Sequence, residues 1–136
     1  LQGRAAGVVR HRFGCRIMQR LLEHCPWIQL LPLVSEMLNE VETLVRHRFG
    51  NYVMQCVIEH GDPDERLQIV DALARDGQAC ARHRFASLVI LRALTHCTSD
   101  TRQRLVRSIC TNQQKWKSVA RTQCGSFVVR EMQSKC

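Results

Sequence analysis

Hydrophobic residues recur three and four positions apart along most of the chain, which is the spacing of one face of an α-helix. The first such segment starts near Phe13 and the second near Phe49, and we expect both apolar stripes to be buried. The stripes are Phe13, Ile17, Met18, Leu21 and Leu22 in the first segment, and Phe49, Val53, Met54, Val57 and Ile58 in the second.

A second helix is predicted after each of these segments. In the second unit Asp62 is the expected N-cap, Pro63 the first helical residue and Glu65 the third, and Gly77 is the expected stop signal. The pattern therefore predicts helices throughout, and the fold class is all-α. The corresponding helices of the other units are expected to follow Pro32, with apolar residues Leu33, Val34, Met37 and Leu38, and Ser99 or Asp100, with Leu105, Val106, Ile109 and Cys110.

The same pattern returns every 36 residues. The tetrapeptide Arg-His-Arg-Phe begins at Arg10, Arg46 and Arg82, and in the sixteen residues from each start nine are identical between the first and second copies and eight between the first and third. A divergent fourth copy begins at Arg121 after an offset of 39, and the chain ends inside it. We predict one repeat domain over residues 1–136, with copies at about 1–38, 39–74, 75–113 and 114–136.

Helical units of this length cannot bury their apolar faces alone. They stack so that each contacts its neighbours, and one helix of each unit lines a concave face. The predicted architecture is an α-solenoid, and its function is expected on the concave face.

Composition adds a basic charge to this picture. Twenty Lys and Arg against twelve Asp and Glu give a net charge of +8, which favours a polyanionic partner such as nucleic acid or an acidic membrane surface. No apolar run approaches the roughly 20 residues of a membrane span, and no signal-peptide pattern is present, so we expect a soluble protein that is not secreted. The eight cysteines form no Cys-x-x-Cys pair, and we expect reduced, mostly buried thiols.

Histidines recur near the ends of the predicted concave helices, at His24, His60 and His96, with Cys25 and Cys97 beside two of them. A structural zinc site needs four converging ligands, and these adjacent pairs lie 72 residues apart, so helix capping and inter-repeat packing are the better interpretation. No nucleophile, metal or phosphate-loop signature is present. We expect no enzyme activity, no metal, no cofactor and no small-molecule substrate.

The segments 11–19 and 47–55, each followed by a Glu-His pair, resemble Pumilio-family (PUF) RNA-binding repeats. The resemblance covers nearly the whole chain, is specific in the first two copies and weakens in the third and fourth. It is to the C-terminal half of a domain that normally carries eight repeats, and it implies a right-handed α-solenoid of repeats about 36 residues long. Because the first residue is Leu1 and the fourth copy stops at Cys136, we expect a fragment.

In that family each repeat offers one base three side chains of the concave helix, two adjacent ones near its start and a third one turn later. Positions i and i+4 share a helix face, so Cys15 and Gln19 could reach one base edge together, while Arg16 projects toward the base stack. The resemblance implies that this first copy reads adenine.

The second copy presents Asn51 and Gln55 to the base edge, with Tyr52 as the stacking side chain. The resemblance implies that this set reads uracil. Because the family binds RNA antiparallel, the first two copies are predicted to bind a 5′-UA-3′ step.

The third and fourth copies depart from the pattern. Leu91 occupies the place of the usual Gln or Glu and can neither accept nor donate a hydrogen bond. In the fourth copy Phe127 could stack on a base, and Arg130 could contact phosphate or a purine edge. The candidate base-edge residues there are Ser87, Ser126 and Arg130, and the candidate stacking residues are Leu88 and Phe127.

The resemblance implies control of messenger RNA in the cytoplasm through untranslated-region elements, with protein partners on the outer surface. Two alternatives stay open: a nucleolar, ribosome-biogenesis type of relative that binds nucleic acid without base selectivity, and a protein-interaction solenoid. The Arg-His-Arg-Phe runs could attract phosphate or could be solvated charge clusters, and their phenylalanines are expected in the core.

Overall fold

The computed structural model describes residues 3–111 and 113–135, and within these ranges all regular structure is helical. The prediction of an all-α chain is confirmed, but the full repeats hold three helices rather than two. A short helix precedes each pair, too short to show helical periodicity in the sequence. The helices are α1 Ala5–Val8, α2 Arg12–His24, α3 Trp27–Leu38, α4 Val41–Leu44, α5 Gly50–His60, α6 Pro63–Ala74, α7 Gly77–Arg82, α8 Ala86–His96, α9 Ser99–Ile109, α10 Gln113–Arg121 and α11 Gln123–Lys135.

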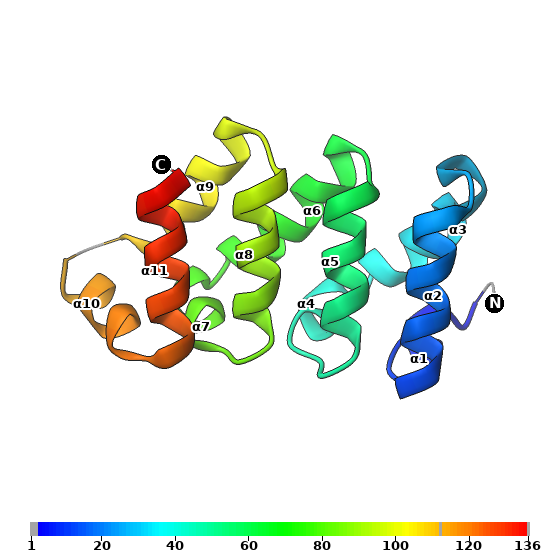
Figure 1. Ribbon diagram of the computed structural model, residues 1–136, viewed down its shortest axis with the longest axis horizontal. Helices are drawn as coiled ribbons and strands as arrows, with labels where there is room; N and C mark the ends of the chain where they lie inside the picture. The colour runs from blue at the N-terminus through cyan, green and yellow to red at the C-terminus, as the bar shows by residue number, and fades with distance from the viewer. Residues whose placement is uncertain (1–2, 112, 136) are drawn as a thin grey trace.

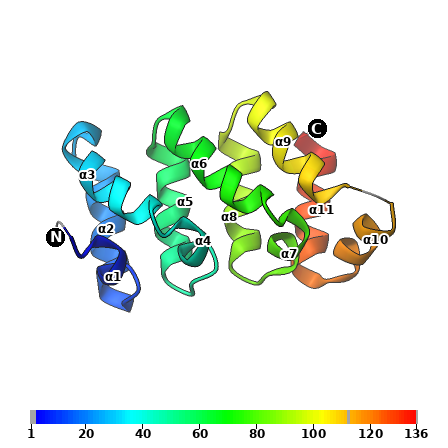
Figure 2. The same ribbon diagram turned by 180° about the vertical axis from the view of Figure 1, so that it is seen from behind.

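The helices form two layers along one axis. Helices α2, α5, α8 and α11, which we call the front helices, lie side by side in Figure 1 with the chain ends at opposite ends of the row. Helices α3, α6 and α9, the back helices, cover the other side (Figure 2). This arrangement is the predicted α-solenoid. The core between the layers is built from fully buried, repeat-equivalent side chains: Met18, Met54 and Ile90 in front, and Met37, Leu73 and Ile109 behind.

The start of α6 follows the prediction. Asp62 and Glu65 form a reciprocal capping box and Pro63 is the first helical residue. Helix α6 ends at Ala74 with Arg75 as its C-cap, before the predicted stop signal at Gly77, although Gly77 itself is not the capping residue. Gly77 instead opens α7 at a close approach, where an added Cβ would lie 2.2 Å from Ser108 Oγ.

The other two back helices begin earlier than predicted. Helix α9 starts at Ser99, and its N-cap is Thr98, whose hydroxyl accepts from the backbone N–H of Thr101 at 3.4 Å. Helix α3 starts at Trp27, so the expected start after Pro32 is wrong. Pro32 lies inside α3, where its ring nitrogen has no hydrogen to donate to the preceding turn.

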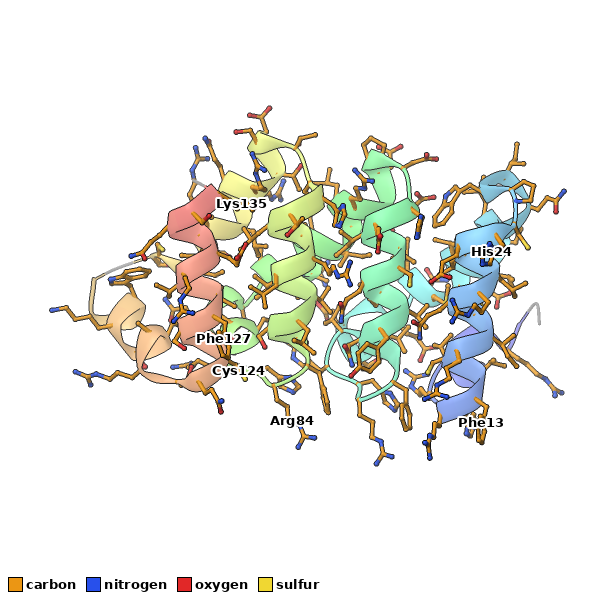
Figure 3. All side chains as sticks on the ribbon, in the orientation of Figure 1. Phe13, His24, Arg84, Cys124, Phe127 and Lys135 are labelled. Carbon is orange, nitrogen blue, oxygen red and sulfur yellow. The ribbon has the colours of Figure 1, made fainter. Side chains whose placement is uncertain are left out.

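The predicted burial of the first apolar stripe is wrong at two positions. Phe13 is 70% exposed and Ile17 is 57% exposed. The equivalent of Ile17 in the second repeat, Val53, is fully buried, because α5 has α2 as a neighbour on that side. Figure 3 shows Phe13 at the end of the first helix of the row, where the described chain places no preceding front helix. Phe49 and Phe85 are only partly buried, so the expectation of core phenylalanines holds in part.

The cysteines in the described part of the chain are free thiols. Four of these seven are buried, as predicted, and the others are Cys25, Cys110 and Cys124. Burial raises the pKa of the Cys56 thiol to about 11, which keeps it protonated and unreactive at neutral pH. None of the described helices is long and apolar enough to cross a membrane.

Candidate nucleic-acid interface

The candidate residues lie at repeat-equivalent positions near the N-terminal ends of the front helices. Figure 3 shows one of them, Phe127, on α11, together with Phe13 and His24 at the two ends of α2. The sets are Cys15, Arg16 and Gln19 on α2, Asn51, Tyr52 and Gln55 on α5, Ser87, Leu88 and Leu91 on α8, and Ser126, Phe127 and Arg130 on α11.

A cleft of about 510 Å³ lies between α2 and α5. Its rim is strongly basic, and an exposed tyrosine, Tyr52, closes one side. A hollow with guanidinium groups and an aromatic face suits a nucleobase and its phosphate. The lining residues are Arg12, Cys15, Arg16, Gln19, Arg20, Glu23, Phe49 and Tyr52.

A second cleft of about 370 Å³ lies between α5 and α8. Tyr52 borders this cleft as well, so its ring stands between two successive hollows. Gln19 lines the first hollow and Gln55 the second. The second cleft is more apolar, because Leu88 and Leu91 lie on its α8 side, next to Arg92, Thr95 and His96 of the same helix.

The first candidate base-edge residue is buried in each of the first three repeats, whereas Ser126 of the fourth repeat is only partly buried. Cys15 is 3% exposed, Ser87 is 2% exposed and Asn51 is fully buried. The Asn51 side-chain Nδ2 donates to the carbonyl oxygens of His47 at 2.8 Å and Arg48 at 3.1 Å. Gln19 and Gln55 are therefore the residues whose side-chain amides reach the surface of the clefts. Asn51 can contact a base only if its Nδ2 gives up the bonds to these two carbonyls.

Gln55 is held at both ends of its amide. Its Nε2 donates to Asn51 Oδ1 at 3.0 Å, and its Oε1 accepts from Arg92 Nε of the next front helix at 3.2 Å. Arg92 Nη1 also donates to Glu59 Oε2 at 3.0 Å. Sequence reasoning missed Arg92. The repeat alignment contained a signal for it. Arg92 directly follows the third candidate position of its repeat, and the equivalent residues of the first and second repeats are Arg20 and Cys56.

The histidines of the second and third Arg-His-Arg-Phe runs accept hydrogen bonds at the starts of α5 and α8, whereas His11 makes no side-chain capping bond. His47 Nδ1 accepts from the backbone N–H groups of Phe49 and Gly50, both at 3.1 Å, and His83 Nδ1 does the same for Phe85 at 3.1 Å and Ala86 at 3.2 Å. Burial and nearby arginines lower the pKa of both His47 and His83. Both imidazoles are therefore held neutral at physiological pH, with Nδ1 as an acceptor.

The arginines of these runs have structural partners. The first arginine of each run reaches the next repeat: Arg10 donates to Glu40 Oε1 and Arg46 to Cys80 Sγ. The second arginine lies over a phenylalanine ring, with the Arg48 and Arg84 guanidinium carbons 4.4 Å from the ring centroids of the adjacent phenylalanines. Neither solvation nor phosphate attraction alone accounts for the runs, although the exposed Arg48 and Arg84 are free to meet a ligand.

The fourth repeat carries an exposed aromatic and cationic pair. Phe127 is 48% exposed, and the Arg130 guanidinium carbon lies 5.9 Å from its ring centroid, one helical turn further on. The pair occupies the positions of the predicted stacking and second base-edge residues of the first two repeats.

The repeated histidines are the last residues of their helices. His24, His60 and His96 end α2, α5 and α8, as their predicted place near the helix C-termini required. The main-chain carbonyl of His96 accepts from Arg66 Nη1 at 3.1 Å, which is an inter-repeat contact. Within residues 3–111 and 113–135, no three His, Cys, Asp or Glu side chains converge as a metal site requires.

Three stretches of the chain match the Pumilio-family RNA binding repeat, at residues 7–38, 41–74 and 79–110. These stretches make up more than half of the sequence, and the chain belongs to the Pumilio family. None of the curated proteins matches the chain in sequence.

Solved structures share the fold. PUF-8 in complex with PBE-RNA superposes with a TM-score of 0.90 and 27% identity, covering 99% of this chain and 40% of that one. The Puf3 RNA binding domain bound to Cox17 RNA 3′ UTR recognition sequence site A superposes with a TM-score of 0.88 and 24% identity, covering 95% of this chain and 37% of that one. The RNA-binding domain of yeast Puf5p bound to SMX2 RNA superposes with a TM-score of 0.83 and 13% identity, covering 97% of this chain and 38% of that one. The chain thus spans about 40% of the length of the PUF-8 chain.

Proposed function

We propose that this chain binds single-stranded RNA selectively along its front helices, and that α2 and α5 read a 5′-UA-3′ step. One observation carries the proposal: Tyr52 stands between two successive clefts, and each cleft holds one glutamine. That is the arrangement expected where one repeat meets one base. The likeness to PUF-8, whose structure contains RNA, supports it.

Each cleft supplies complementary chemistry to a base. The amides of Gln19 and Gln55 can donate to and accept from a Watson–Crick edge, and the Tyr52 ring offers a stacking surface that is worth about 1–3 kcal/mol per base. The Arg16 guanidinium plane offers a second stacking surface, and Arg12 and the net positive charge attract the phosphates and make binding salt-dependent.

The third and fourth repeats contribute contact without the same selectivity. Leu88 and Leu91 offer a base apolar surface and no hydrogen bond, so several bases fit equally well there. Phe127 stacks on a base in the fourth repeat, and Arg130 meets a phosphate or a purine edge. Base selection in the chain is concentrated in its first two repeats.

The biological role that follows is post-transcriptional control of messenger RNA in the cytoplasm. Protein partners would contact the back helices, where Ile28 of α3 is 77% exposed and Leu31 is 39% exposed.

The test is fluorescence anisotropy of labelled eight-nucleotide RNAs with a central UA, AU or CC step, at two salt concentrations. The proposal predicts tightest binding to the UA RNA at both salts, and weaker binding to a DNA of the same sequence. Equal binding to all the RNAs, with an affinity that falls steeply as salt rises, would show nonselective electrostatic binding rather than base reading. If the chain binds none of these RNAs, the alternative of a protein-interaction solenoid is favoured.

A further inference from the structure

The two base-reading glutamines have different surroundings. Gln55 is held by Arg92 of the following repeat, whose Nε donates to Gln55 Oε1 at 3.2 Å. Arg92 is itself fixed by Glu59 Oε2 at 3.0 Å. The Gln55 Nε2 donates to Asn51 Oδ1, so both ends of its amide are assigned.

At the equivalent place beside Gln19 the chain has Cys56. The thiol is buried, and its pKa is raised to about 11, first by burial and then by Glu23 and Glu59, so it stays a neutral thiol and offers no guanidinium-like donor. Among the described residues, no hydrogen bond is made by the Gln19 side chain. Its amide is free to turn, whereas that of Gln55 is held.

The orientation of a glutamine amide decides which base it suits. Uracil presents an N–H donor at N3 between two carbonyl acceptors, whereas cytosine presents an acceptor at N3 beside an amino donor. An amide that accepts from uracil N3 must rotate by half a turn to donate to cytosine N3. A free amide makes that rotation at little cost. At Gln55 the rotation breaks the bonds to Arg92 and Asn51 and turns an N–H group toward the guanidinium.

We propose that Arg92 is a positioning residue that fixes the Gln55 amide and so sharpens base selection by the second repeat. The first repeat, whose Gln19 faces Cys56, discriminates less strictly. This inference rests on the proposed function, since it concerns selectivity among RNAs that the chain must first bind.

The experiment compares Arg92→Met with a matched control, Arg20→Met. Arg20 holds the same place in α2, and its side chain is 75% exposed. It pairs with Glu23 of its own helix at 2.9 Å and does not touch a base-reading amide. Each variant loses one arginine from the same face, so the loss of phosphate attraction is comparable. The Arg92 side chain is itself 45% exposed, and its replacement is not expected to unfold the chain.

Dissociation constants are measured for RNAs that carry UA, CA or UC at the central step. Arg92→Met is expected to lower the preference for U over C at the 5′ base by at least about fivefold, and to leave the preference at the 3′ base unchanged. Arg20→Met is expected to weaken binding to all three RNAs equally. The gain-of-contact variant Cys56→Arg should raise the preference for A over C at the 3′ base, because it places a guanidinium beside Gln19.

Equal weakening of all RNAs by Arg92→Met, as for Arg20→Met, would overturn the inference and leave Arg92 as a phosphate contact. In that case the wild-type chain still selects UA and the proposed function stands. A wild-type chain that binds no RNA, or binds UA and CA equally, would overturn the proposed function and this inference together.

Discussion

The indole Nε1 of Trp27 donates to Glu65 Oε1 at 3.1 Å and thereby ties the first back helix to the second. The other carboxylate oxygen, Oε2, accepts from the backbone N–H of Asp62 at 2.6 Å. Glu65 is only 8% exposed, so one side chain both caps α6 and joins two repeats.

Glu65→Ala should lower the free energy of unfolding by about 1–2 kcal/mol, because it removes the acceptor of two part-buried hydrogen bonds, one of them the cap of α6. Chemical denaturation monitored by circular dichroism measures this change. The control is Asp64→Ala on the same turn, whose exposed side chain predicts a change within about 0.5 kcal/mol. Equal stability of the two variants would show that the Trp27 contact has no energetic weight.

The glycines at the starts of the front helices differ in how much space surrounds them. A Cβ at Gly14 would lie 2.1 Å from the backbone oxygen of Val8, whereas one at Gly50 would first meet the flexible end of Leu44 at 2.8 Å. Gly14→Ala is therefore expected to cost about 1–3 kcal/mol, because backbone must move. Gly50→Ala should cost less, since Leu44 can move aside and alanine favours the helix. The third repeat holds Ala86 at this position. Thermal melts of both variants test the order, and a Gly14→Ala variant as stable as Gly50→Ala would contradict it.

We predict that Asn51 contributes mainly to stability and Gln55 mainly to recognition. Asn51→Ala removes buried hydrogen bonds to the His47 and Arg48 carbonyls and should cost about 1–2 kcal/mol of stability. Gln55 lies at the cleft surface, where water replaces its partners, so Gln55→Ala should change stability by less than about 0.5 kcal/mol. Urea denaturation of the two variants distinguishes these roles. Equal losses would mean that Gln55 is also a structural residue.

The chain should lose stability in mild acid. The pKa values of His47 and His83 are lowered in the folded state from the ordinary value of 6.5. As pH falls below 6.5, the unfolded chain takes up protons that these two imidazoles resist in the folded chain, because burial and then the nearby arginines disfavour the charged imidazole there. Their stabilising contribution is thus complete above pH 6.5 and is lost as pH falls through the folded pKa values.

Melting temperatures between pH 8 and pH 5 measure this dependence. The double variant His47→Asn/His83→Asn keeps a capping acceptor that does not titrate, so its melting temperature should fall less over the same range. The same acid sensitivity in the variant would assign the effect to other groups.

Most of the fold could be predicted from the repeat pattern of the sequence. The 36-residue period predicted the stacking of units, and the capping residues Asp62 and Glu65 placed the start of α6 correctly. Boundaries failed where tertiary packing decides them. Pro32 is accommodated inside α3, and Gly77 is required by the approach of Ser108 rather than by a helix end. Phe13 repeats the sequence of Phe49, but burial depends on a neighbouring helix that periodicity within one unit does not report.

The sequence predicted which helices carry the candidate site residues, but it did not predict the hydrogen bonds that these residues make. Tyr52 and the glutamines lie at the clefts where the predicted spacing places them. The burial of Asn51 and the link from Arg92 to Gln55 could not be predicted, because both depend on which rotamers the packed repeats allow. Whether each repeat reads the predicted base stays a prediction.

The central claim is that one repeat reads one base, and single-base substitution of the UA RNA tests it most directly. Dissociation constants are measured for every base at each position of the step, with the wild-type chain, Gln19→Ala and Gln55→Ala. We predict that Gln55→Ala removes about 1–3 kcal/mol of selectivity at the 5′ base alone, and that Gln19→Ala removes selectivity at the 3′ base alone. Variants that weaken all the RNAs alike, or that relax both positions together, would contradict base-by-base reading.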